Sequence, residues 1–355
     1  MCRRAVLCLA LAGACLAREL IFPDSLQIRP DDQVVLASEG FEGDQKFAGL
    51  TTFANLPWQH CLSTSDEQYD IAFLGAPFDT ATTGRPGARF GPTGIRLGSR
   101  RLHASAGWSA YTHENAFQSW AKVIDCGDAP LTFLDNTAAL KQLVSAHKQV
   151  SGKHTNASDI DSPSLGPVNV IHFDSHIDTW DPKVLGGGIS HYAGVNHGTF
   201  LHIAVEEGLV LNNSIHAGIR APAVNKKYDW KHDKACGFEI VTARDIDRMG
   251  ISGIIQKLKS RVGDSNVYIT VDIDVLDPAY APATGTAEVG GWTTRELLSI
   301  LDGLEGLKVI GADIVEVAPV YDNAGETTVL AAAEVAHSLM TLMVQTPVKA
   351  SRDAD

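Results

Sequence analysis

The sequence contains no heptad repeat and no internal repeat, and we expect no membrane-spanning segment in it. It also lacks an excess of basic residues, because 42 Asp and Glu outnumber 29 Lys and Arg and give a net charge of −13. These absences argue against a coiled coil, a membrane-spanning protein, and a partner that is nucleic acid or an anionic membrane. The acidic balance suits a small cationic substrate, although charge alone identifies none.

Cysteines are few and irregularly placed. Three of the six lie among the first 15 residues, and only Cys61, Cys126 and Cys236 follow. Because these three are odd in number and widely spaced, they imply no disulfide framework. Cys126 lies in an apolar, strand-like run, so we expect a buried thiol there.

Residues 1–17 have the pattern of a secretory signal peptide, with two arginines, an apolar stretch and a small residue at the expected cleavage point. We therefore expect the protein to be secreted or to enter the secretory pathway. Asn156 and Asn212 lie in glycosylation motifs, and in that compartment they could carry glycans.

The full sequence is 45% hydrophobic and 20% charged, so the chain after residue 17 can form one large α/β domain. We expect an N-terminal arm at 18–68, a domain at 69–347 and a tail at 348–355. Short apolar runs predict strands at 71–75, 122–126, 168–173, 214–218, 238–242, 267–271 and 308–315. Helical patterns between them cover 137–150, 199–207, 246–262, 294–304 and 327–344, which is typical of a parallel sheet.

Two acidic segments stand at the ends of apolar strands. Asp174, His176 and Asp178 follow one strand, and Asp272 and Asp274 end another. Residues two apart leave a strand on the same side, so each segment directs its polar side chains together. Burying them without a cation would be costly, and mixed oxygen and imidazole ligands suit a divalent ion such as Mn²⁺. The sequence therefore predicts a metal site.

Five segments together resemble the ureohydrolase (arginase/agmatinase) family, and more specifically its agmatinase-like branch. The segments are GRPGARFGP at 84–92, HFDSHIDTW at 172–180, NHGTF at 196–200, TVDIDVLDPAYAPATGT at 270–286 and DIVEVAP at 313–319. The resemblance runs from about residue 69 to the C-terminus, with the motifs in family order. It implies a three-layer α/β/α fold with a mostly parallel sheet (the arginase-like fold) and a homo-oligomeric enzyme.

The resemblance also assigns the metal ligands. It implies that Asp174 and Asp272 bridge two Mn²⁺ ions, that His176 and Asp274 hold one ion, and that Asp178 holds the other. A bridging water would become the nucleophile that attacks the guanidinium carbon. His172 precedes these ligands by one strand period, and we expect it to satisfy a backbone group.

Two further residues match family residues that contact the substrate. His197 matches the histidine that carries a proton to the leaving amine, and Glu316 matches the carboxylate that pairs with the planar guanidinium. With the ligand Asp178 they form the expected catalytic set. The alternative for Glu316 is a buried salt bridge with Arg220.

One family segment is missing. The family carries a strand that ends in Gly-Gly-Asp-His, followed by a helix, just before the strand at 168–173, and no such segment occurs here. Its histidine is the sixth metal ligand, so one ion site is incomplete. His154 lies in a polar linker and His191 in a Gly-rich loop, which makes both poor substitutes. We favour a truncated form over a degenerate member, because every other motif is intact.

The expected function is Mn²⁺-dependent release of urea from a linear guanidino compound, with agmatine, giving putrescine, as the leading substrate. One alternative is a guanidinobutyrase, in which Lys183 or Arg220 would pair with the substrate carboxylate. Another is a catalytically impaired family member. Arginase is disfavoured, since the 18 residues between Asp178 and His197 differ from the arginase loop in composition.

Overall fold

The computed structural model describes residues 7–10, 13–16, 47–63, 68–151, 166–190, 192–225 and 227–348. Most of the expected signal peptide and arm, Asn156, His154, His191 and nearly all of the tail lie outside these residues. The chain divides into two units, Met1–Gln45 and Lys46–Asp355. In the first unit, strands β1 (Leu7–Ala10) and β2 (Gly13–Leu16) form an antiparallel pair. The rest of the fold belongs to the second unit.

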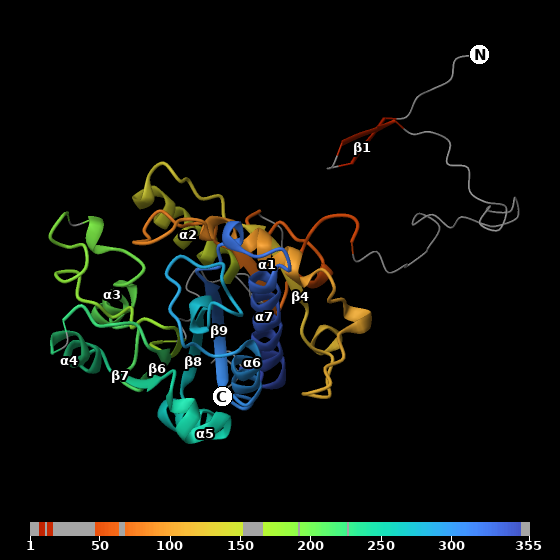
Figure 1. Cartoon of the computed structure of the whole chain (residues 1–355). Coiled ribbons are helices and arrows are strands. Elements are labelled where there is room, and N and C mark those ends of the chain that lie inside the picture. The colour runs from red at the N-terminus through yellow and green to blue at the C-terminus, as the bar shows by residue number, and fades with distance from the viewer. Residues whose placement is uncertain are drawn as a thin grey trace, which may run out of the picture. The chain divides into compact units, whose positions relative to one another are not determined.

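Two parallel sheets form the centre of the second unit (Figure 1). The larger sheet has the strand order β7-β6-β5-β8-β9, and the smaller sheet pairs β3 with β4. Their bounds are β3 Ile71–Gly75, β4 Val123–Asp128, β5 Asn169–Phe173, β6 Ser214–Ile219, β7 Phe238–Thr242, β8 Asn266–Asp272 and β9 Lys308–Val315.

Helices cover both faces of the larger sheet, which gives the three-layer α/β/α architecture of the arginase-like fold. The helices are α1 Gly91–Ser99, α2 Asn136–Ser151, α3 Phe200–Glu206, α4 Tyr228–Ala235, α5 Asp245–Val262, α6 Thr294–Asp302 and α7 Thr327–Gln345. Helices α5, α6 and α7 bury the main hydrophobic core against one face. A smaller cluster lies on the opposite face, where it joins Leu201 of α3 to Val170 and Phe238.

Strand β5 shows how the alternation of side chains positions the site. Ile171 and Phe173 are fully buried in the core against α5, α6 and α7. Val170 packs in the opposite cluster, so His172 and Asp174, two and four residues later, start from that same face. The polar residues at the end of β5 therefore approach α3 and α4 rather than the main core.

The two sheets meet at helix α7. Ile71 and Phe73 of β3 and Ile314 of β9 pack against the same apolar cluster, which includes Ala333 and Met340 of α7. Most residues of β3 and β9 are only half-buried, whereas every residue of β5 and β6 is buried. Strands β3 and β9 are both edge strands of the sheets that the structure describes. Two such edges are the pattern left when a strand between them is missing.

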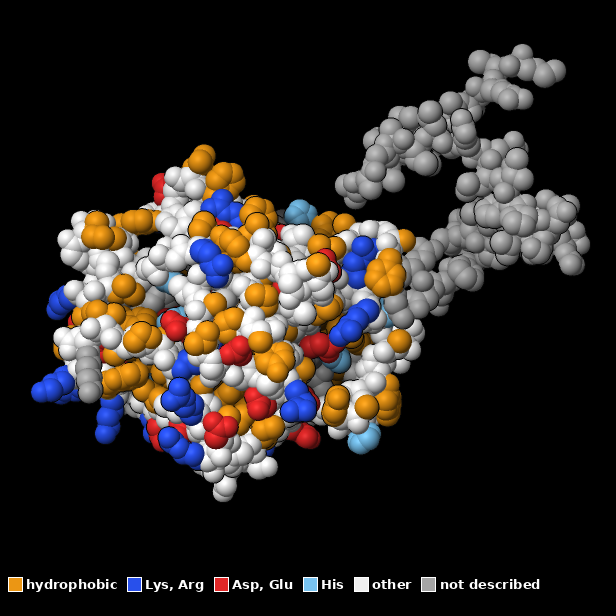
Figure 2. All heavy atoms as spheres, in the orientation of Figure 1, with side chains coloured by type: hydrophobic (Ala, Val, Ile, Leu, Met, Phe, Trp, Pro, Cys, Tyr) orange, Lys and Arg blue, Asp and Glu red, His pale blue; other side chains and the backbone are white. Residues whose placement is uncertain are grey.

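Helix α7 is long and apolar enough, by length and composition, to cross a membrane, with a mean hydropathy of 1.4. Two thirds of that stretch (67%) is buried inside the domain. Its hydrophobicity therefore serves the core. On the face shown in Figure 2, acidic and basic side chains alternate with apolar ones and form no patch of a single sign.

The expectation that Cys126 is a free thiol is wrong. Cys61 and Cys126 form a disulfide, and both are buried together with Ile124 in a small apolar cluster. The odd cysteine among the three is Cys236, which is free and buried. Sequence spacing could not reveal the pair, because tertiary folding brings together two residues that lie 65 positions apart.

We expect this disulfide to contribute about 4 kcal/mol to the free energy of unfolding, because closing a loop of 65 residues restricts the unfolded chain. Urea denaturation with and without a thiol reductant measures the loss. A Cys61→Ala/Cys126→Ala variant is the control, and reductant should leave its stability unchanged. An equal reductant effect on both proteins would contradict the assignment.

Candidate metal centre and active site

The acidic segments meet at the carboxyl ends of two adjacent parallel strands. Strand β5 pairs with β8 along its whole length, with Phe173 opposite Val271. Asp174 follows β5 directly, and Asp272 is the last residue of β8. Parallel α/β sheets place their ligand sites at this end of the strands.

Asp174, His176 and Asp274 form a first group that could hold a cation, with donor atoms within 4.8 Å of one another. The Nδ1 atom of His176 lies 3.2 Å from Oδ1 of Asp174 and 3.1 Å from Oδ2 of Asp274. Both carboxylates are fully buried, and His176 is partly exposed.

Backbone and hydroxyl donors fix the orientation of these carboxylates. Ser175 donates to Oδ1 of Asp274 through its amide, at 3.1 Å, and through its hydroxyl, at 2.8 Å. The amide of Asp274 donates to Oδ1 of Asp272 at 2.8 Å, so Asp272 caps the short 3₁₀ helix Ile273–Val275. Burial and the charges of Asp274 and Asp174 raise the pKa of Asp272, but this residue belongs to neither donor group.

A second group consists of His172, Asp174 and Asp178, all buried. The expectation that His172 satisfies a backbone group is wrong, because its ring contacts side chains. Its Nδ1 is hydrogen-bonded to Nδ1 of His216 at 2.8 Å, and its Nε2 lies 3.0 Å from Oδ2 of Asp174. Sequence reasoning missed this role, although His172 shares the strand period of the ligands.

The hydrogen bonds determine which nitrogen of His172 carries the proton. Nε2 of His216 lies 2.9 Å from the carboxylate of Asp233, and burial lowers the pKa of His216, so that imidazole is neutral. Its Nε2–H donates to Asp233, and its Nδ1 therefore accepts from Nδ1–H of His172. In a neutral His172 this would leave the lone pair of Nε2 facing Asp174, whereas a doubly protonated ring would donate to Asp174 from Nε2. A lone pair so close to a carboxylate oxygen is repulsive unless a cation or proton lies between them.

The charges of the cluster call for a cation. Burial raises the pKa of Asp178, Asp272 and Asp274, and the charge of nearby carboxylates raises it further. Burial disfavours the charged imidazole of His176, yet its hydrogen bonds to Asp174 and Asp274 raise the pKa of His176 to about 11. The Oδ2 atom of Asp174 accepts no well-aligned hydrogen bond among the described residues. This oxygen-rich donor set with imidazole nitrogens fits divalent cations such as Mn²⁺.

His197 and Glu316 face each other beside the buried carboxylates. Nδ1 of His197 lies 3.6 Å from Oε1 of Glu316, and Glu316 adds to the repulsion felt by Asp178 and Asp272. The backbone amide of Thr83 donates to Nε2 of His197 at 3.1 Å. In the neutral imidazole the proton must therefore be on Nδ1, the atom that faces Glu316.

Strained backbone occurs at two of the expected site residues. Asp178 and Glu316 have φ of 50° and 60°, in the left-handed region that residues with a side chain seldom adopt. Gly285 lies beside Glu316, where a Cβ would be 3.1 Å from Oε2 of Glu316 and 3.0 Å from the carbonyl oxygen of Arg85. The absence of a side chain at Gly285 therefore leaves room for the Glu316 carboxylate.

Arg220 does not pair with Glu316. Its guanidinium donates to backbone carbonyls, at 2.6 Å to that of Asp274 and at 2.7 Å to that of Glu288. These bonds hold the loop after β8 in place, so the alternative of a salt bridge with Glu316 is wrong. Lys183 is exposed.

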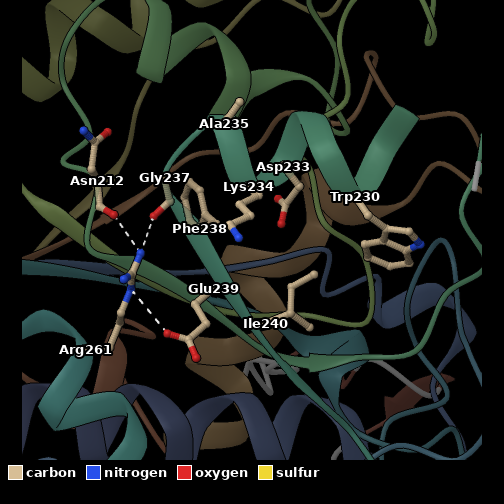
Figure 3. A pocket seen from close by; sticks show the side chains of 10 residues that line it. All are labelled: Asn212, Trp230, Asp233, Lys234, Ala235, Gly237, Phe238, Glu239, Ile240 and Arg261. Atoms are coloured by element: carbon tan, nitrogen blue, oxygen red, sulfur yellow. Dashed lines mark hydrogen bonds and ion pairs between the residues drawn. The ribbon is translucent and has the colours of Figure 1, made fainter. Parts of the chain in front are cut away.

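A separate hollow of about 670 Å³ lies beside α4 and β7 (Figure 3). Arg261 lines it and donates to the backbone carbonyls of Asn212 and Gly237. None of the expected site residues lines this hollow. It touches the site's surroundings only through Asp233, whose carboxylate is engaged by His216 and Thr179.

Without added cations, we expect Asp178→Asn to raise the free energy of unfolding by about 1 kcal/mol at pH 7, since it removes one buried like charge. Added Mn²⁺ should stabilise the unaltered protein and stabilise this variant much less. Thermal and urea unfolding with and without Mn²⁺ measure both effects.

The matched control is Asp277→Asn, in the loop after β8. Three backbone amides, of Ala279, Gly290 and Gly291, hold the pKa of Asp277 below its ordinary value despite partial burial. Its neutralisation should therefore lower stability. Destabilisation of similar size in both variants would show that the cluster carries no net repulsion.

Comparison with known proteins agrees with this geometry. The model of the arginase family matches residues 69–342. The protein named "Putative agmatinase 1" from Schizosaccharomyces pombe is 50% identical, covering 86% of this chain and 85% of its own length. The human mitochondrial guanidino acid hydrolase is 35% identical, with 80% of each chain covered.

Among solved structures, a hypothetical agmatinase from Burkholderia thailandensis superimposes with a TM-score of 0.71 at 31% identity. The match covers 84% of this chain and 92% of that one. Fold, motif order and identity thus lead to one assignment: the chain belongs to the arginase family, in its agmatinase-like branch, and is built as a hydrolase of guanidino C–N bonds.

Proposed function

We propose that this chain is built to release urea from agmatine, leaving putrescine. The observation that carries the proposal is the pair formed by Glu316 and His197, which face each other at 3.6 Å beside the buried carboxylates. Bound Mn²⁺ would supply a water activated for attack on the guanidinium carbon at neutral pH. The residues of the chain account for the remaining steps.

Glu316 binds the guanidinium group in this proposal. Its two oxygens match two parallel N–H donors of a planar guanidinium, which fixes both the position and the plane of the carbon to be attacked. Its side chain is largely shielded from solvent, with 11% exposed, so the ion pair forms in a site where little water competes. The left-handed backbone at Glu316 sets the direction of this side chain, and Gly285, which has no side chain, leaves room for the carboxylate.

His197 donates a proton to the leaving amine in this proposal. Thr83 holds its Nε2, and this leaves the proton on Nδ1, which faces Glu316 and a substrate bound there. From this position Nδ1–H can donate to the departing nitrogen as the C–N bond breaks. His197 is 22% exposed, so solvent can return the proton afterwards.

A cationic amine at the far end of the substrate is favoured over a carboxylate. Glu288 lies at the rim, half-buried, with its carboxylate 4.0 Å from Nε2 of His176. Arg220, one of the two cations considered for a substrate carboxylate, is committed to backbone carbonyls. The second candidate function is a guanidinobutyrase, supported by the likeness to the human guanidino acid hydrolase, and it would require Lys183 to turn inward.

We propose that the chain as written is impaired, because a strand and one histidine ligand are missing between β4 and β5. The half-buried edges of β3 and β9 support this. The alignment with the Schizosaccharomyces pombe protein has 338 positions, more than 86% of 355 residues, so that relative carries residues for which this chain has no counterpart. The ion held by Asp178 would then be bound more weakly than its partner.

We also propose that the protein enters the secretory pathway and assembles into homo-oligomers. The disulfide Cys61–Cys126 supports an oxidising compartment. Large apolar side chains at the surface, among them Tyr111 at 86% and Leu134 at 88% exposure, support association with further copies.

We expect an inserted Gly-Gly-Asp-His strand and helix between Ser162 and Gly166 to restore urea release that depends on Mn²⁺. The insertion supplies the missing ladder partner and the missing ligand together. A second insertion ending in Gly-Gly-Asp-Ala separates the two, since it restores the strand without the imidazole. Urea formation from agmatine and from 4-guanidinobutyrate measures activity and substrate choice. Equal urea release by the unmodified chain and the repaired chain would refute the impairment.

In the repaired enzyme, we expect Glu316→Gln and His197→Ala each to lower kcat/KM about 100-fold or more while leaving the bound metal unchanged. Glu316→Gln should act through binding and His197→Ala through kcat. The matched control is Glu305→Gln, which alters an exposed glutamate in the turn between α6 and β9. Metal loss in step with activity would assign these residues to the metal site instead.

A further inference from the structure

Three side chains that can ligate a metal gather between helices α3 and α4, outside the carboxylate cluster. They are His202 of α3, His232 of α4 and Cys236, which directly follows α4. We propose that they bind one divalent transition-metal ion of the Zn²⁺ type. This site shares no residue with the proposed Mn²⁺ ligands.

The donor atoms already have the spacing of a tetrahedral site. Nε2 of His232 lies 3.0 Å from Nδ1 of His202 and 3.7 Å from the sulfur of Cys236, and all three donors are within 4.8 Å of one another. Zinc bonds to nitrogen and sulfur imply edges of about 3.3 Å between two nitrogens and about 3.6 Å between nitrogen and sulfur. A small outward shift of the two imidazoles would therefore admit the ion.

The sequence builds this arrangement from helical spacing. His232 and Cys236 are four residues apart, so they project from the same side of α4. His202 and Glu206 have the same spacing on α3, and the Glu206 carboxylate lies 3.4 Å from Nε2 of His202. A carboxylate on the second nitrogen orients an imidazole and makes its first nitrogen a better ligand.

The surroundings favour a cation. His202 and Cys236 are 7% and 4% exposed, and the ring of Tyr228 stacks on His232 with 5.5 Å between centroids. Burial, together with the charges of Asp233, Glu206 and Asp181, raises the pKa of Cys236 to about 11. The same negative potential that disfavours a free thiolate would be relieved by a bound divalent ion.

Three protein ligands leave a fourth position for water. The ion would link α3 to α4, and α3 begins at Phe200, three residues after His197. The site would thus fix the segment that carries the proposed proton donor. A direct hydrogen bond between two histidines links these helices without metal, and the ion would replace it with two stronger bonds.

Co²⁺ is the probe, because a cobalt–thiolate bond gives a charge-transfer absorption that oxygen and nitrogen ligands do not. The full-length chain, stripped of metal with a chelator, is titrated with Co²⁺ and then with Zn²⁺. We expect the thiolate band to saturate at one ion per chain and to be displaced by Zn²⁺. Binding at the carboxylate cluster is silent in this band.

Variants locate the site. Cys236→Ser should abolish the band, and His232→Asn, which preserves hydrogen bonding, should weaken Co²⁺ binding at least tenfold. His147→Asn, on the exposed surface of α2, is the control and should change nothing. Absence of the band in the unaltered chain, or its persistence in Cys236→Ser, would overturn the proposal. The first of these outcomes needs no variant to fold.

Discussion

Mutual repulsion among buried carboxylates is the constraint around which this structure is arranged. Asp174, Asp178, Asp272 and Asp274 are withdrawn from water at the ends of two adjacent strands, where burial and the charges of Asp174 and Asp274 raise the pKa of Asp178 and Asp272. Among these four carboxylates only Asp174 has a lowered pKa, because its contacts with His172 and His176 outweigh its burial. Such a cluster opposes folding unless a cation occupies it. Binding of a metal at this cluster would therefore stabilise the domain.

The surrounding framework holds the cluster open against that repulsion. The Arg220 guanidinium donates hydrogen bonds to backbone carbonyls of the loop after β8. Ser175 donates two hydrogen bonds to the Asp274 carboxylate. A series of side-chain hydrogen bonds runs from His172 of β5 through His216 to Asp233 of helix α4. Helices α3 and α4 both adjoin the site. Helix α3 follows the loop that carries His197, and helix α4 carries Asp233. The proposed zinc-type site would join these two helices at a second point.

Sequence reasoning predicts the strands well, because buried parallel strands are apolar, β-branched runs with clear ends. The predicted bounds of β3, β7 and β9 agree with the structure. Helices α1 and α4 are missed for different reasons. Helix α1 is rich in glycine, and Gly94 and Gly98 allow it to approach Pro319 and Val329 more closely than any Cβ would permit. Helix α4 carries few apolar residues, so it has no amphipathic period to detect.

The site residues also differ in how far the sequence predicts them. Ligand spacing along one strand can be read from sequence, since the side-chain period of a strand is fixed. The disulfide, the tautomer of His197 and the role of His172 depend on residues that are distant in sequence, and no local pattern encodes them.

Helix α7 explains how the domain can tolerate a gap in its sheet. A central strand normally supplies a hydrogen-bonded ladder on both sides, and its loss leaves two edges. Here the apolar side chains of β3 and β9 still share one cluster on α7, so hydrophobic burial continues where the backbone ladder stops. That burial is non-directional and preserves the fold. In the impaired form that we propose, it would not replace an imidazole ligand whose position depends on the missing strand. The fold and the complete metal site therefore rest on different forces, and only the second requires the absent segment.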